Sequence, residues 1–259
     1  MIKRIVIGSA IAAAGLAGYM SVRRWWETWG VDPEEGSRSL PGDELVPDAT
    51  MVDTRGITID APVGQVWPWL VQMGYGRGGW YSWDAIDMKG SSAEAIRPEL
   101  QQVAVGDVFP TDPGGGFVVK VVEPERALVL YVDPEILAAR KPSGPVVGDE
   151  LGLAASGKFL ETATPPRFTL AWAFVLEPVE GERTRLIERF RARIESESQG
   201  SKALAPLLGF GLFLMTQRQM RNIQARAEKL AREREAFHRD VDAVVERALT
   251  GDPAEAPAG

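Results

Sequence analysis

The feature that most constrains the fold is a pair of neighbouring segments in which apolar and polar residues alternate strictly. These segments cover residues 168–176 and 184–194. A period of two is typical of β-strands with one buried and one solvated face, and a short connection makes such strands antiparallel. The inward-facing set is Phe168, Leu170, Trp172, Phe174, Leu176, Leu186, Phe190, Ala192 and Ile194. The opposite face carries Arg189, Arg191 and Arg193, which we expect to be solvated.

Shorter segments earlier in the chain extend this sheet. Residues 57–59, 117–121 and 128–132 each show strand-like alternation. Residues rich in Gly, Pro and Asp at 112–116 and 124–125 predict the turns between them. The sequence therefore predicts a curved antiparallel sheet with one face toward the core.

Two segments show helical periodicity instead. Ala61 and Pro62 end the first strand, and apolar residues then recur at helical spacing over residues 63–71, where Pro68 should bend or shorten the helix. A longer helical pattern runs over residues 206–248. The predicted fold class is α+β, with the sheet wrapped around a long C-terminal helix.

Residues 1–29 contain a hydrophobic segment bracketed by basic residues. Residues 5–22 are 18 positions without a charge, close to the roughly 20 that a membrane-spanning helix needs. Basic pairs lie on both sides, and Trp25, Trp26 and Trp29 follow, as is typical of membrane interfaces. We expect a single-pass anchor in the cell membrane, with its orientation open. A cleaved signal peptide and a helix lying on the domain are the alternatives.

The remaining boundaries follow from composition. Residues 30–49 are rich in Gly, Pro and acidic side chains, which predicts a solvated linker. The main domain is expected over residues 50–235, with a loop-rich insertion at 134–167. Residues 236–259 are expected to form a helical extension and a disordered tail.

Composition excludes several classes of function. The net charge of -7 argues against nucleic acid as a partner, and the chain has no cysteine and one histidine, His238, so no thiolate or His-rich metal site is expected. The spacing Gly74-x-Gly76-x-x-Gly79 resembles a dinucleotide fingerprint, but it follows a predicted helix rather than a strand. We therefore expect a tight turn there, with no cofactor. The sequence leaves the oligomeric state open.

Four ordered motifs resemble one superfamily. They are residues 57–67 (ITIDAPVGQVW), 72–84 (QMGYGRGGWYSWD), 184–191 (TRLIERFR) and 215–228 (MTQRQMRNIQARAE). Together they resemble a bacterial subgroup of the START-like superfamily, also described as SRPBCC or polyketide cyclase/dehydrase and lipid transport-like proteins. The resemblance implies a helix-grip fold with a hydrophobic tunnel, which in relatives holds lipids, polyketides or other apolar molecules.

Four polar residues are candidates for the mouth or the interior of such a cavity. Arg77, Tyr81 and Asp84 lie close together in the sequence within aromatic surroundings. Asp84 would serve as an acid or base if desolvated, whereas capping a helix or pairing with Arg77 would give it a structural role. Glu188 falls on the apolar face of its strand, as the polar handle of a cavity or as the partner of a neighbouring arginine.

Large apolar residues complete the predicted ligand-binding set, as stacking surfaces for a planar ligand or as core. They are Trp67, Trp80, Trp172, Phe174, Phe190, Phe210 and Leu214. We expect membrane-tethered binding or carriage of a hydrophobic small molecule, either a lipid or a polyketide-like compound. An aromatase/cyclase-like enzyme and an interaction module without a ligand are the alternatives.

Overall fold

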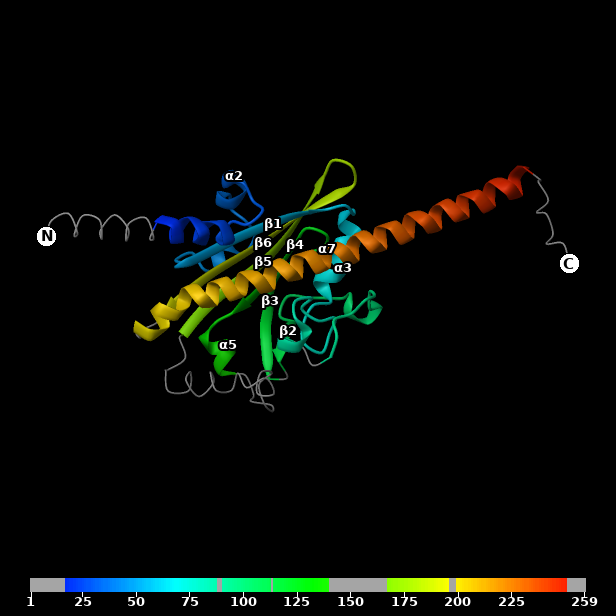
Figure 1. The fold of residues 1–259 in the computed structure, drawn as a ribbon. Helices are drawn as coiled ribbons and strands as arrows, with labels where there is room; N and C mark the ends of the chain where they lie inside the picture. Colours follow the sequence, from blue (N-terminus) through cyan, green and yellow to red (C-terminus); the bar gives the residue numbers. More distant parts are fainter. Residues whose placement is uncertain (1–16, 88–89, 113, 140–166, 196–198, 251–259) are drawn as a thin grey trace.

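The computed structural model describes residues 17–87, 90–112, 114–139, 167–195 and 199–250. Six antiparallel strands form one sheet in the order β1-β6-β5-β4-β3-β2, so the first strand of the chain pairs with the last. A helix of 52 residues, α7 (Gln199–Thr250), runs across this curved sheet (Figure 1). The chain therefore has the α+β helix-grip architecture, and the predicted fold class is confirmed.

The strands and helices follow one another as the sequence indicated. The strands are β1 (Met51–Ile59), β2 (Val108–Asp112), β3 (Gly115–Glu123), β4 (Ala127–Val132), β5 (Arg167–Val179) and β6 (Arg183–Glu195). Besides α7, the named helices are α2 (Pro33–Ser37), α3 (Val63–Val71), α4 (Asp84–Asp87) and α5 (Pro134–Ala138), with short 3-10 turns at Asp43–Leu45 and Pro98–Leu100.

The hairpin of β5 and β6 lies inside the sheet, and the predicted inward-facing residues in its middle are buried, whereas Ile194 near its end is 41% exposed. Trp172 lies opposite Phe190, and Phe174 lies opposite Glu188; all four side chains are buried. Gly181 and Glu182 in the connecting loop both have left-handed backbones, which lets a tight hairpin follow the right-handed twist of its strands.

Helices α3 and α7 cover the inner face of the sheet and close the core. Val66 and Leu70 of α3 are fully buried, one helical turn apart. On α7, Met220, Ile223 and Ala227 are fully buried at spacings of three and four residues. Helical periodicity in the sequence therefore corresponds to real packing faces.

The outer face of the sheet differs from the prediction. Arg189, expected to be solvated, is only 3% exposed because residues 30–49 pack over it, and the expectation of a solvated linker is wrong for Leu40 and Val46, which are buried. Arg189 donates hydrogen bonds to the Arg38 and Gly36 carbonyl oxygens and to the Asp43 carboxylate. A guanidinium carries five N–H donors, so it can hold an irregular segment against a strand.

The N-terminal region is described only in part. Residues 1–16, most of the predicted membrane segment, lie outside the described residues, as do residues 140–166 of the predicted insertion. Residues 17–27 are helical, and Trp26 is buried against Phe210 of α7, with 5.3 Å between ring centroids. Within the described ranges no helix is long and apolar enough to cross a membrane.

Replacing Arg189 with Ala tests the covering of the outer face. We expect the free energy of unfolding to fall by about 2–4 kcal/mol, because Asp43 and two backbone carbonyls lose a buried donor. Urea titration measures this change. Arg193→Ala on the same strand face is the control, because Arg193 forms only exposed pairs, with Asp48 and Glu195, and its loss should leave stability nearly unchanged. Equal effects of the two substitutions would contradict the assigned role of Arg189.

Candidate functional site

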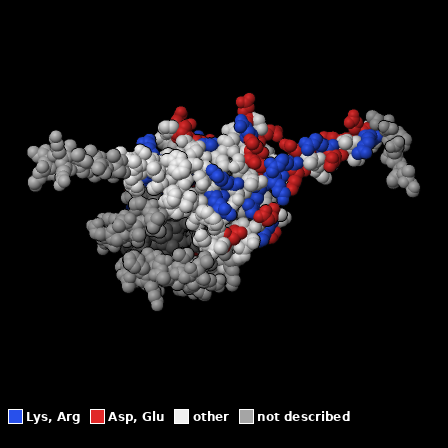
Figure 2. Space-filling model, viewed as in Figure 1, with Lys and Arg blue, Asp and Glu red and all other residues white. Residues whose placement is uncertain are grey.

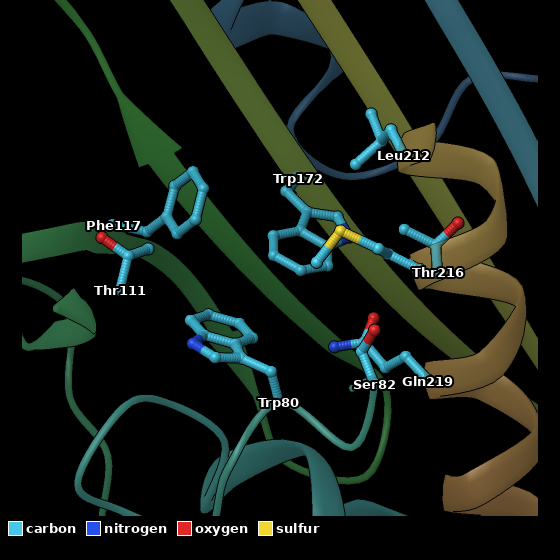
Figure 3. A pocket seen from close by; sticks show the side chains of 9 residues that line it. Trp80, Ser82, Thr111, Phe117, Trp172, Leu212, Thr216 and Gln219 are labelled. Atoms are coloured by element: carbon cyan, nitrogen blue, oxygen red, sulfur yellow. The ribbon is translucent and has the colours of Figure 1, made fainter. Parts of the chain in front are cut away.

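A pocket of about 180 Å³ lies between the sheet, the loop that precedes α4, and α7 (Figure 3). Aromatic side chains enter it from the sheet and from that loop, while α7 supplies the opposite wall. The lining residues are Trp80, Ser82, Thr111, Phe117, Trp172, Leu212, Met215, Thr216 and Gln219. Such a site is apolar with a few polar groups, as ligand pockets generally are.

Stacked aromatic rings build one side of the pocket. The Trp80 and Trp172 rings lie 5.2 Å apart and only 14° from parallel, and Phe117 meets both of them edge-on. Phe190 stacks on Trp172 at 4.7 Å from β6. Four large rings from four segments therefore share one cluster, and it presents flat apolar surfaces to the pocket.

The glycine-rich turn after α3 places Trp80 in this cluster. Gly74 and Gly79 form a β-bridge, and both have positive φ angles. A Cβ atom on Gly79 would lie 2.4 Å from the hydroxyl oxygen of Ser92, so only glycine fits there. The predicted tight turn is confirmed, and its close packing returns Trp80 to the sheet.

Two polar atoms in the pocket wall lack a partner. Ser82 Oγ and Gln219 Oε1 are both buried, and neither has a hydrogen-bond partner among the described residues. The Gln219 amide nitrogen is 3.6 Å from the Met73 sulfur, and the Thr216 hydroxyl donates to the Phe213 carbonyl oxygen. Since buried polar groups are nearly always satisfied in folded proteins, Ser82 and Gln219 define where a bound molecule would find hydrogen bonds.

Glu188 lies directly behind the Trp172 indole. It is fully buried, and its Oε1 accepts a 2.7 Å hydrogen bond from Trp172 Nε1. Burial raises the pKa of Glu188 to about 7, although the positive charge of Arg55 and the indole hydrogen bond both act in the opposite direction. The carboxyl group thus fixes the orientation of a ring that lines the pocket.

Arg55 connects Glu188 to the rest of the molecule. It lies opposite Glu188 in the β1–β6 register, pairs with Asp53 at 2.7 Å and donates to the Trp26 carbonyl oxygen at 3.1 Å. Burial, the largest effect, raises the pKa of Asp53 despite its bond to Arg55. The sequence left open whether Glu188 was the polar handle of a cavity or the partner of an arginine. In the structure, Glu188 orients the Trp172 ring and faces Arg55, but the direct ion pair of Arg55 is with Asp53.

The other predicted polar residues stabilise the glycine-rich turn. Arg77 donates to the Met73 and Val71 carbonyl oxygens, and Asp84 accepts from the Ser92 backbone N–H and hydroxyl. Tyr81 accepts from the Gln72 amide, and burial raises its pKa to about 12. Asp84 thus bonds to Ser92, which is neither the pair with Arg77 nor the helix cap that the sequence suggested, and none of the three predicted residues lines the pocket.

The predicted apolar residues divide between pocket and core. Trp80 and Trp172 line the pocket, whereas the others lie beside it or away from it. Phe174 and Phe190 are buried next to Trp172, and Trp67 packs partly buried at the edge of the core. Phe210 contacts Trp26, and Leu214 is 37% exposed.

Sequence reasoning missed all four residues of the pocket wall on α7. Leu212, Met215, Thr216 and Gln219 follow spacings of three and four residues, so they share one helix face, and Leu214 lies on another. The one feature of the sequence that could have indicated this wall is Gln219, a polar residue on a mostly apolar helix face. Among the described residues, no cluster of three or more His, Asp or Glu side chains could hold a metal ion.

Comparisons with known proteins give distant structural likenesses. No family model and no curated protein matches the sequence. A hypothetical protein, jhp0584, from Helicobacter pylori is 13% identical, covers 74% of this chain and 96% of its own, and has a TM-score of 0.41. A conserved protein from Geobacillus kaustophilus is 17% identical over 67% of this chain and 93% of its own, with a TM-score of 0.35.

A third similar structure is the Zhui aromatase/cyclase from Streptomyces sp. R1128. It is 12% identical, covers 71% of this chain and 94% of its own, and has a TM-score of 0.26. The structural neighbours therefore include an aromatase/cyclase as well as conserved proteins. The helix-grip architecture of this chain rests on its own strand order and on the course of α7.

Glu188→Gln tests the buried carboxyl group. The pKa of Glu188 in the folded protein, about 7, exceeds its ordinary value of 4.5, so the folded state binds this proton more tightly than the unfolded state does. Wild-type stability should therefore fall, relative to the variant, as the pH rises from about 5 to 8, by roughly 3 kcal/mol. Urea titrations across this pH range measure the difference.

Glu195→Gln, at the exposed end of the same strand, is the control and should show no such pH-dependent difference. In NMR spectra, the Trp172 indole N–H resonance should titrate near pH 7 in the wild type and stay fixed in Glu188→Gln. An unchanged wild-type resonance between pH 5 and 9 would contradict the raised pKa.

Proposed function

We propose that this protein binds a small, planar, mostly apolar molecule that carries a hydroxyl or similar polar group. The observation that carries the proposal is an aromatic-walled pocket with two unpartnered polar atoms, Ser82 Oγ and Gln219 Oε1. A ligand hydroxyl would donate to Gln219 Oε1 and accept from the Ser82 hydroxyl. Each bond would satisfy a group that is costly to leave unpaired.

The size of the pocket limits the ligand. An engineered apolar cavity of about 150 Å³ binds benzene in another protein. The 180 Å³ between Trp80, Trp172 and α7 therefore suits one aromatic ring with a short substituent. A larger polyketide or lipid would require the α7 wall to move.

Binding is favoured over catalysis by the chemistry of the lining. Its nine residues include no Asp, Glu, His, Lys, Arg or Tyr, so none of them supplies a general acid or base at neutral pH. Glu188 has a suitable pKa but lies behind the Trp172 ring. An aromatase/cyclase-like activity would need a route from the ligand to this carboxyl group.

Membrane tethering is a separate part of the proposal. The uncharged residues 5–22 would anchor the chain, and the helix that continues from them packs on α7 through Trp26 and Phe210. Phe210 precedes the pocket residue Leu212 by two positions, so an anchored helix would hold the pocket close to the bilayer, where apolar ligands concentrate.

Paired ligands test the binding site. Calorimetric titration with 4-propylphenol and propylbenzene should show a preference for the phenol of roughly fivefold to tenfold, the value of one neutral hydrogen bond. Gln219→Leu should reduce this preference, because only the bond to Ser82 remains, while Gln217→Leu, on the same helix but outside the pocket, should preserve it. If the wild type binds neither compound, the proposed binding function is wrong.

Removal of residues 2–16 tests the tether. The full chain should remain with membranes in a carbonate wash, and the shortened chain should appear in the supernatant, because the uncharged segment supplies the membrane affinity. The shortened chain should keep its preference for 4-propylphenol over propylbenzene. Identical fractionation of the two chains would contradict tethering without affecting the pocket.

A further inference from the structure

The last third of α7 extends beyond the domain. Ala231 is the last buried residue of this helix, and from Arg232 to Leu249 every residue except the half-buried Ala236 is exposed. Figure 1 shows this part of the helix projecting past the sheet and all the other labelled elements. Most helical stability in proteins comes from packing an apolar face, and this segment has nothing to pack on within the described chain.

The projecting segment nevertheless carries an apolar stripe. Phe237, Val241, Val244 and Ala248 follow spacings of four, three and four residues, and we refer to these four residues as the α7 seam. The exposed fractions of Phe237 and Val244 are 66% and 58%. Alternating spacings of three and four residues are the pattern of helices that pair in coiled coils.

The seam continues the stripe that packs on the sheet. Met220, Ile223 and Ala227 are buried in the core. The same spacing of three and four residues continues along the helix through Leu230 and Arg234 to Phe237, and Arg234 is the only polar residue in this series. One apolar face therefore runs along α7, covered by the domain at one end and exposed at the other.

We propose that a second copy of this chain covers the α7 seam in an antiparallel helix pair. In this arrangement Phe237 lies against the partner's Ala248, and Val241 lies against the partner's Val244. The twofold axis repeats both contacts, giving four layers. Each large phenylalanine meets a small alanine, which fills the space between the helices evenly.

Charges beside the seam favour the same arrangement. Asp240 and Arg247 flank the α7 seam on one side, seven residues apart. Antiparallel helices bring each Asp240 next to the partner's Arg247, which forms two ion pairs of opposite charge. A parallel pair would instead place Phe237 against the partner's Phe237 and Asp240 beside the partner's Val245, without charge complementarity.

A membrane surface is a poorer match for this segment. Residues 232–249 contain four arginines and five carboxylates, and Figure 2 shows acidic and basic side chains interspersed along the projecting helix. Helices that lie on anionic bilayers have a basic polar face. The overlap of about sixteen residues is short, so we expect a reversible dimer that forms at high concentration.

Charge reversal tests the pair in the full chain. Sedimentation equilibrium in mild detergent, over roughly 5–500 µM, should show a monomer–dimer equilibrium. Asp240→Arg or Arg247→Asp alone should weaken dimerisation about tenfold, and the double variant should restore it to within about threefold. Asp242→Arg, on the same helix but away from the seam, is the matched control and should dimerise as the wild type does.

Cysteine crosslinking tests the orientation, since the natural chain has no cysteine. A mixture of the Phe237→Cys and Ala248→Cys variants should form a mixed disulfide under mild oxidation. Phe237→Cys alone should not crosslink, because antiparallel pairing separates its two copies by about 16 Å along the helices. A monomer at all concentrations, single reversals without effect, crosslinking of Phe237→Cys alone, or no disulfide in the mixture would each overturn the proposal.

Discussion

The buried carboxyl group of Glu188 is the constraint on which the site depends. An ionised carboxylate inside a sheet is costly unless other groups compensate it. Here the Trp172 indole donates to it, and Arg55 faces it across the β1–β6 pairing. The hydrogen bond fixes the Trp172 ring, on which Trp80 stacks from one segment and Phe190 from another. The aromatic side of the pocket therefore owes its shape to one polar group.

The same cluster joins parts that are distant in the sequence. Arg55 lies within 6 Å of the ring centroids of Phe190 on β6 and Phe213 on α7, and it donates to the Trp26 carbonyl oxygen. The N-terminal helix, the sheet and the pocket-forming part of α7 thus meet at one buried cation. Arg55 also links Trp26 to the pocket wall, because the Phe190 ring that it faces stacks on Trp172.

Much of this fold could be predicted from the sequence, and the pocket only in part. Strict alternation gave the β5–β6 hairpin, and the position of Glu188 among apolar neighbours correctly marked a buried carboxyl group. The packing of Leu40 and Val46 was missed because isolated apolar residues in an irregular segment have no periodicity. Whether Met215 or Leu214 faces the pocket depends on the rotation of α7 about its axis, and tertiary packing determines that rotation.

Helix α7 has three different surroundings along its length, so no single apolar face describes the whole helix. Leu212 to Gln219 present a mixed face to the pocket, Met220 to Ala231 an apolar face to the core, and Phe237 to Ala248 an apolar stripe to solvent. A helix that packs only on its own domain has an apolar stripe where it faces the core and polar residues where it faces solvent. An apolar stripe that continues to Ala248, 17 residues beyond the last buried side chain at Ala231, gains nothing from the domain itself. Its persistence is therefore best explained by a second interface.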